Sequence, residues 1–263
     1  MTQVSTTDAS QINKLAEGLT AGPQVISTEA PAATSVTLPG GYVTSEGMLI
    51  KTAEVRELNG LDEEAIAKSG STAKALQTVL ERGLVKLGDR DATRDDLNNL
   101  LAGDRDAIAL SIRKVTFGKT AEFTAYCDGC QNVQEFMVDL DADVEVKELD
   151  NPIADRSLTI KLRAGVARVS LPNGATQRKI MENATKTVAE LNTLILSGCV
   201  TSINEAPVSP LSVLELGILD RETLIKEIIE HNPGPRLGEV SKVCEACGKE
   251  VDLPLSLATL FRL

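Results

Sequence analysis

The residues best able to carry out chemistry in this sequence are four cysteines that form two Cys-x-x-Cys motifs. Cys127 and Cys130 make the first motif, and Cys244 and Cys247 make the second. This spacing lets two sulfurs of one tight turn bind the same tetrahedral metal ion at Zn–S distances of about 2.3 Å. Two thiolates leave zinc two ligands short, and neither motif has a further Cys or His at metal-binding spacing. We therefore expect all four cysteines to share about one structural zinc ion per chain.

Three other arrangements of these thiols are weighed against a shared zinc site. A thiol redox protein would carry one such motif at the N-terminus of a helix, whereas strand-like sequence flanks both motifs here. A disulfide within either turn would be strained. Two chains could also pair their motifs between subunits. The 113 residues that separate the motifs (131–243) are far more than the spacer of an ordinary zinc ribbon, so the motifs need another reason to meet.

An internal repeat indicates how the two motifs can meet. Three segments of the first half recur in the same order in the second half, and they are residues 76–87, 103–118 and 123–140 against residues 191–203, 219–234 and 240–257. Equivalent residues are offset by only 115 to 117 positions, as one duplication would produce. If the two halves pack about a pseudo-twofold axis, their cysteine motifs lie opposite one another.

The order of the elements predicts an α+β fold with two tandem pseudo-symmetric halves. Each half is expected to contain helices and a strand-knuckle-strand hairpin like that of a zinc ribbon. The expected boundaries are a flexible N-terminal arm at 1–35, a first half at 36–150 and a second half at 151–263. The arm is rich in Ser, Thr, Ala, Gln and Pro without a sustained apolar face, although it could become ordered against a neighbouring subunit.

Several other residues are predicted to be structural. Asp104 and Asp220 each precede an apolar pattern at helical spacing, so we expect N-caps or first-turn acids beside solvated arginines. Cys199 aligns with Leu84 of the first half and is expected to be a small buried hydrophobic residue. His231 ends a predicted helix and has no counterpart in the first half.

Composition and charge disfavour several classes of function. The net charge is −11 and no window is rich in Lys or Arg, so we expect no nucleic-acid partner. No stretch approaches the roughly 18 consecutive apolar residues that span a bilayer, so we expect no membrane partner. The sequence has no phosphate-binding loop and no Gly-x-Ser-x-Gly motif, and its only histidine has no nucleophile at a recognisable spacing. We therefore predict no catalytic residue, no cofactor-binding residue and no enzymatic activity.

Taken together, these patterns resemble the baseplate and hub assembly proteins of T-even-type contractile-tailed bacteriophages. The resemblance is carried by the turn at 38–40, the segments 58–64 (LNGLDEE) and 101–117, the two cysteine motifs, and the end of the sequence at 260–263. It implies a non-enzymatic protein of the tail tip that binds other tail and baseplate proteins, and a homo-oligomer is a further expectation. Such a protein is found in the virion tail or, during assembly, in the host cytoplasm. A cellular zinc-ribbon adaptor or regulatory protein and a thiol redox protein are the alternatives.

Overall fold

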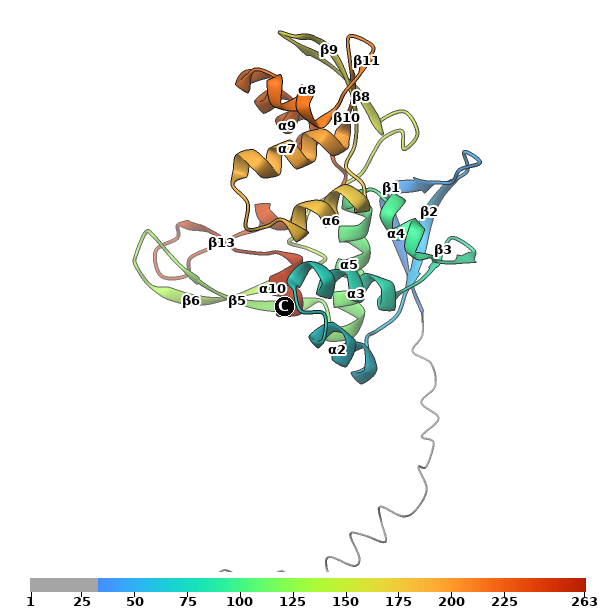
Figure 1. Ribbon diagram of the computed structural model, residues 1–263. Helices are drawn as coiled ribbons and strands as arrows, with labels where there is room; N and C mark the ends of the chain where they lie inside the picture. Colours follow the sequence, from blue (N-terminus) through green and yellow to red (C-terminus); the bar gives the residue numbers. More distant parts are fainter. Residues whose placement is uncertain (1–32) are drawn as a thin grey trace, which may run out of the picture. The chain divides into compact units, whose positions relative to one another are not determined.

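A computed structural model of the chain describes residues 33–263 and combines helices with antiparallel sheets (Figure 1). The predicted α+β class is therefore confirmed. The arm predicted at 1–35 lies outside the described residues except at its end, where Thr34 and Ser35 belong to the first strand. No helix among residues 33–263 is long and apolar enough to cross a membrane.

The first part of the described chain builds a four-stranded antiparallel sheet with helices packed on it, followed by a long hairpin. The sheet has the order β1-β2-β3-β4. The elements are β1 (Thr34–Val43), β2 (Leu49–Val55), α2 (Gly60–Ala67), α3 (Thr72–Gly83), β3 (Leu84–Leu87), β4 (Arg90–Asp91), α4 (Arg94–Asn99), α5 (Ala102–Phe117), β5 (Thr120–Tyr126) and β6 (Val133–Asp139).

The second part builds another four-stranded sheet, of order β11-β10-β9-β8, and another hairpin. Its elements are β7 (Val146–Lys147), β8 (Ser157–Leu162), β9 (Gly165–Ser170), α6 (Gly174–Glu182), α7 (Val188–Cys199), β10 (Val200–Ile203), β11 (Ala206–Pro207), α8 (Pro210–Glu215), α9 (Ile218–His231), β12 (Gly234–Pro235), the 3-10 turn η1 (Leu237–Glu239), β13 (Ser241–Val243), β14 (Glu250–Asp252) and α10 (Leu257–Phe261). The short strands β7 and β12 pair with each other in antiparallel register.

Most helices begin where a side chain caps them, although α5 and α9 have no side-chain cap. Ser71 accepts a hydrogen bond from the Lys74 N–H at the start of α3, and Thr187 accepts one from the Glu190 N–H at the start of α7. Such caps satisfy backbone donors that the first helical turn leaves unpaired. Both helices contain twelve residues and run directly into a strand, so Cys199 occupies the place of Gly83 and not of Leu84. Cys199 is buried, as expected.

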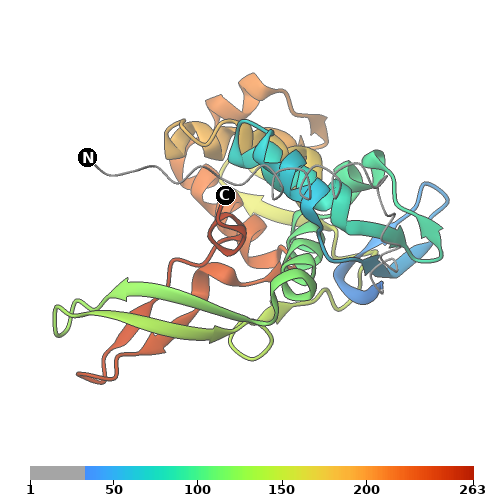
Figure 2. The same cartoon turned by 90° about the horizontal axis from the view of Figure 1, so that it is seen from below.

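Three apolar clusters hold these elements together. The first lies between the β1–β3 strands and helices α3 and α5, and the third lies between the β8–β10 strands and helices α7 and α9. The second cluster contains residues of both hairpins and of α10. In Figure 2 the β5–β6 and β13–β14 hairpins run alongside one another. The second cluster therefore places the two cysteine motifs, which lie at the tips of these hairpins, in the same region.

Candidate metal centre

The first cysteine motif forms the turn of the β5–β6 hairpin. The two strands pair in regular antiparallel register from Thr120 opposite Asp139 to Tyr126 opposite Val133. The turn is closed by two backbone hydrogen bonds. The Cys127 N–H donates to the Asn132 carbonyl at 2.9 Å, and the Gln131 N–H donates to the Cys127 carbonyl at 2.8 Å.

The second motif forms the same turn between β13 and β14. The Cys244 N–H donates to the Lys249 carbonyl at 2.8 Å, and the Gly248 N–H donates to the Cys244 carbonyl at 2.8 Å. In both turns the residue after the second cysteine has a left-handed backbone, with φ of 62° at Gln131 and 74° at Gly248. Glycine adopts this conformation without steric cost, whereas a residue with a Cβ does so less readily.

The four sulfur atoms of the two turns form one cluster. All lie within 4.8 Å of one another. The Cys127 and Cys247 sulfurs are 3.6 Å apart, as are the Cys130 and Cys244 sulfurs. Four sulfurs at about 2.3 Å from a central zinc ion would be separated by about 3.8 Å. The spacing therefore fits four ligands around one ion, and it is too long for an S–S bond of about 2.05 Å.

The surroundings of the cluster hold it in place. Cys127 and Cys244 are buried, Cys130 is half-buried and Cys247 is exposed. Gly129 allows the two turns to approach, because a Cβ there would lie 2.8 Å from the Lys249 Cδ atom and 3.2 Å from the Cys247 sulfur. A buried apolar cluster packs between the hairpins and α10, and it includes Phe136, Val138, Val251, Leu253 and Leu260.

A glutamine that sequence reasoning missed also belongs to the site. The Gln134 amide nitrogen lies 2.7 Å from the Cys244 sulfur, and its amide oxygen accepts a hydrogen bond from the Glu245 N–H at 3.3 Å. Gln134 thus connects a strand of the first hairpin to the turn of the second. Its place four residues after Cys130 in an alternating strand was the only available signal, and alternation alone does not distinguish it from a surface residue.

The thiols differ in their readiness to ionise. Burial opposes ionisation of Cys244, but the Cys247 N–H and the Gln134 amide outweigh it and lower the pKa of Cys244 to about 6. The Lys249 N–H acts in the same direction on Cys247, but the neighbouring Cys244 thiol and burial raise the pKa of Cys247 to about 12. Burial raises the pKa of the isolated Cys199 thiol to about 12. Cys199 is therefore an inert core residue, whereas several thiolates in the cluster would repel one another unless a cation lay between them.

The two predicted first-turn acids lie apart from the cysteine cluster. Asp104 and Asp220 occupy the third positions of α5 and α9, but each side chain bonds to another element. Asp104 accepts a hydrogen bond from the Gly40 N–H at 2.6 Å, and Asp220 accepts one from the Arg163 N–H at 2.9 Å. Both acids therefore tie a helix to the first hairpin of its sheet.

The expectation of solvated arginines beside these acids is wrong for the first half. Arg105 is only 3% exposed, and its guanidinium donates to the Leu97 carbonyl at 2.9 Å and to Gln77 at 2.9 Å. Burial therefore lowers the pKa of Arg105 to about 10. His231 is exposed at the end of α9, where its Nδ1 atom lies 2.9 Å from the Glu227 carbonyl oxygen.

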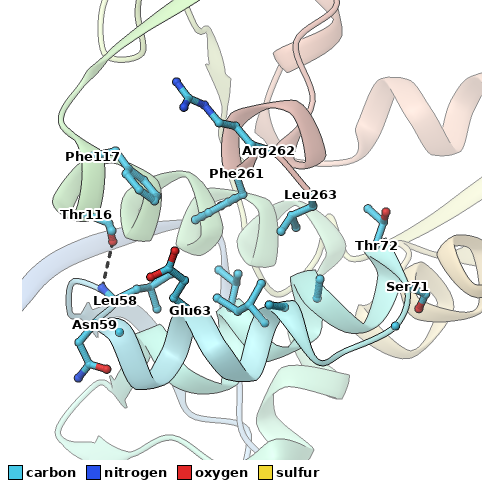
Figure 3. A pocket seen from close by; sticks show the side chains of 16 residues that line it. Leu58, Asn59, Glu63, Ser71, Thr72, Thr116, Phe117, Phe261, Arg262 and Leu263 are labelled. Atoms are coloured by element: carbon cyan, nitrogen blue, oxygen red, sulfur yellow. Dashed lines mark hydrogen bonds between the residues drawn. The ribbon is translucent and has the colours of Figure 1, made fainter. Parts of the chain in front are cut away.

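A separate apolar groove of about 780 Å³ lies beside α2 (Figure 3). We call it the α2 groove. It is lined by residues of α2, α3, the end of α5 and the end of α10, namely Leu58, Asn59, Gly60, Glu63, Ile66, Ala67, Gly70, Ser71, Thr72, Ala75, Val79, Thr116, Phe117, Phe261, Arg262 and Leu263. One wall is fixed by the Leu58 N–H, which donates to Thr116 at 3.1 Å. The lining combines apolar side chains with a few polar ones and contains no cysteine or histidine.

The fold and the site together define an α+β protein with a four-cysteine cluster able to bind a metal ion. Residues 50–206 match the family described as T4 bacteriophage base plate protein. This match covers more than half of the chain, which therefore belongs to that family and is a structural protein of the phage tail baseplate. It includes Cys127 and Cys130 but ends before Cys244. No curated protein and no solved structure matches the chain.

Proposed function

We propose that the chain is a non-enzymatic component of the baseplate hub in which one zinc ion, bound by Cys127, Cys130, Cys244 and Cys247, joins two halves of the protein. The observation that carries this proposal is the convergence of four sulfurs within 4.8 Å from turns 117 positions apart. A site with four cysteine ligands has no open position for water or substrate, so its role is structural.

We further propose that the halves, at 36–150 and 151–263 after an arm at 1–35, arose by duplication. Two arginines that make equivalent hydrogen bonds support this, although only Arg105 is buried and Arg221 is partly exposed. Arg221 donates to the Val213 carbonyl at 2.8 Å and to Thr193 at 2.8 Å. Arg105 makes the same two bonds to Leu97 and Gln77, and each of these three residues lies 116 positions before its counterpart. The shared sheet order and the two identical knuckle turns support the same conclusion.

The zinc ion would add stability where the apolar core is small. The cluster that joins the hairpins contains one buried phenylalanine, and its other buried members are aliphatic residues and cysteines. Metal binding to a site absent from the unfolded chain contributes directly to the free energy of folding. A thiol redox function is disfavoured because each motif lies in a hairpin turn and not at a helix N-terminus. Membership of the baseplate family disfavours a cellular adaptor.

The zinc proposal is tested by the metal content of the purified full-length chain. We expect about one zinc per chain, and we expect the Cys127→Ser and Cys244→Ser variants to lose it. Cys199→Ala is the matched control, because this cysteine is equally buried but lies outside the cluster. A strong chelator should lower the melting temperature of the wild type and of this control. Metal-free protein with an unchanged melting temperature would show that the cluster is not a zinc site.

The hub proposal is tested separately, by locating the protein in particles. Mass spectrometry of purified virions and of isolated baseplates should detect the chain if it stays in the tail. Detection only in infected-cell extracts would indicate an assembly factor, and detection in baseplates at the outer rim alone would contradict a hub position.

A further inference from the structure

The two halves meet through a compact junction made by α6 of the second half. Leu101 and Asn173 form an isolated antiparallel bridge there. The Ala102 N–H donates to the Pro172 carbonyl at 2.8 Å, and the Gly174 N–H donates to the Leu100 carbonyl at 2.9 Å. The start of α6 therefore covers the corner between α4 and α5 of the first half.

The same corner of the second half, between α8 and α9, is not covered by any described residue. Four apolar side chains are exposed there, which we call the corner surface: Leu211 (64%), Leu214 (59%), Ile218 (75%) and Leu219 (50%). The residues 116 positions earlier are Asp95, Asn98, Ala102 and Gly103. Of these, Ala102 and Gly103 are buried against the second half, Ala102 beside Pro172 and Gly103 beside Pro233. The second half thus presents large apolar residues at the site where the first half is covered.

The first half has the complementary surface, also without an occupant among the described residues. Its counterpart of α6 is α2, because Leu58, Asn59 and Gly60 lie 114 positions before Pro172, Asn173 and Gly174. Asn59 and Asn173 both cap the helix that follows. In the second half this stretch is packed in the junction, whereas in the first half it lines the α2 groove.

We propose that the corner surface of one copy of this chain docks into the α2 groove of a second copy. The contact would repeat, between copies, the contact that joins the two halves, and it rests on the proposed duplication. The two surfaces lie at opposite ends of the described chain, near α8 and near α2 (Figure 1). The corner surface of one copy therefore cannot reach the α2 groove of the same copy. Head-to-tail contacts of this kind between copies build a ring or a filament.

The sizes of the side chains support this pairing. A Cβ on Gly103 would lie 1.6 Å from the Pro233 carbonyl oxygen, so the junction within the chain has no room for a larger residue. Leu219 is the residue of the second half that is equivalent to Gly103, and a surface that covers it must have a cavity for its side chain. The α2 groove supplies about 780 Å³ of it, with an apolar lining that suits leucine and isoleucine.

Two acidic side chains that face each other should weaken the contact between copies. In the junction within the chain, the Gln177 amide donates to Asp106 at 2.6 Å. The equivalent residues between copies are Glu63 and Glu222, two acids that repel when both are ionised. We therefore expect association at high protein concentration, as in a growing baseplate, and strengthening by Glu222→Gln.

Sedimentation velocity on the zinc-loaded full chain tests this proposal. The wild type should associate as its concentration rises, and Glu222→Gln should shift this to about tenfold lower concentration. Leu214→Asp on the corner and Gly60→Trp in the groove should each stay monomeric. Met48→Asp is the matched control, because Met48 is 58% exposed but belongs to neither surface.

Mixing the two monomeric variants distinguishes head-to-tail contact from a symmetric dimer. Each variant keeps one intact surface, so an equimolar mixture should form a dimer and nothing larger. Wild-type protein that stays monomeric throughout the accessible concentration range, or a mixture that does not dimerise, would overturn the proposal. Zinc content and incorporation into tails are measured independently, so either can hold when this association fails.

Discussion

The first turns of α5 and α9 carry the same acid in two different settings. Asp220 uses both carboxylate oxygens, one bonded to the Arg163 N–H at 2.9 Å and the other to the Ala164 N–H at 3.0 Å. Asp104 uses one oxygen for the Gly40 N–H, and its other oxygen is buried without a hydrogen-bond partner among the described residues. Burial raises the pKa of Asp104 to about 7. Asp104 and Asp220 thus both tie a helix to its sheet. Burying the Asp104 carboxylate costs more, because one of its oxygens has no hydrogen-bond partner among the described residues.

The cause of this difference is what covers each helix. The second half packs over the start of α5, so Ala102, Gly103 and Asp104 are buried. No described residue covers the start of α9 in this way, where Ile218 and Leu219 are exposed. Side chains at equivalent backbone positions are therefore packed to different degrees. Substitutions at matched positions should show this as unequal changes in stability.

The largest contrast is expected at Gly103 and its counterpart Leu219. Gly103→Ala should lower the free energy of unfolding by about 3 kcal/mol or more, because the new Cβ meets backbone atoms of Pro233. Leu219→Ala removes a half-exposed side chain and should cost about 0.5 kcal/mol. Urea unfolding followed by circular dichroism measures both. Equal stabilities for the two variants would contradict the account of the junction.

The next contrast concerns pH. Because the pKa of Asp104 is raised to about 7 in the folded state, the folded protein retains a proton that the unfolded chain releases. Stability from this group is therefore greatest below about pH 4 and declines up to about pH 7, by about 3 kcal/mol between pH 4.5 and pH 7.5. Asp104→Asn should flatten this decline, as measured by urea unfolding at pH 4.5 and 7.5.

Asp220→Asn is the matched control for that pH series. It replaces one acceptor oxygen by a donor group opposite a backbone N–H, so it should destabilise the protein by about 1 to 3 kcal/mol at pH 7.5. The buried-acid interpretation fails if the wild type and Asp104→Asn show the same dependence on pH. Asp106, whose pKa burial raises to about 6, keeps titrating in Asp104→Asn, so some dependence on pH should remain in that variant.

The smallest contrast lies between the two hairpins. Gln134 on β6 holds the Cys244 sulfur, whereas Val251 stands at the equivalent position of β14. Gln134→Val should keep the proposed zinc ion but weaken its binding about tenfold, because the Cys244 sulfur would lose an orienting hydrogen bond. Competition with a chelator of known affinity measures this change. An unchanged affinity would show that Gln134 has no effect on the metal centre.

Local patterns in the sequence were enough to predict much of this architecture. Helical and strand periodicity, the capping residues and the two cysteine spacings depend on residues near one another in the chain, and the offsets of 115 to 117 come from comparing such local segments with each other. They predicted the α+β class, the family confirmed over residues 50–206 and the four cysteines that meet. Local alignment did misplace Cys199 by one residue, since helix length and not residue similarity sets its counterpart.

Only the tertiary structure decided which of the two equivalent corners, α4–α5 or α8–α9, is covered by another part of the protein. The burial of Arg105, the unpaired oxygen of Asp104 and the hydrogen bond from Gln134 all depend on residues far away in the sequence. Periodicity reports which side of an element is apolar, but it does not report what packs there. The sequence by itself therefore determined the α+β class and the two cysteine motifs that meet. Packing decided that one half is covered at its α4–α5 corner while the other exposes leucines.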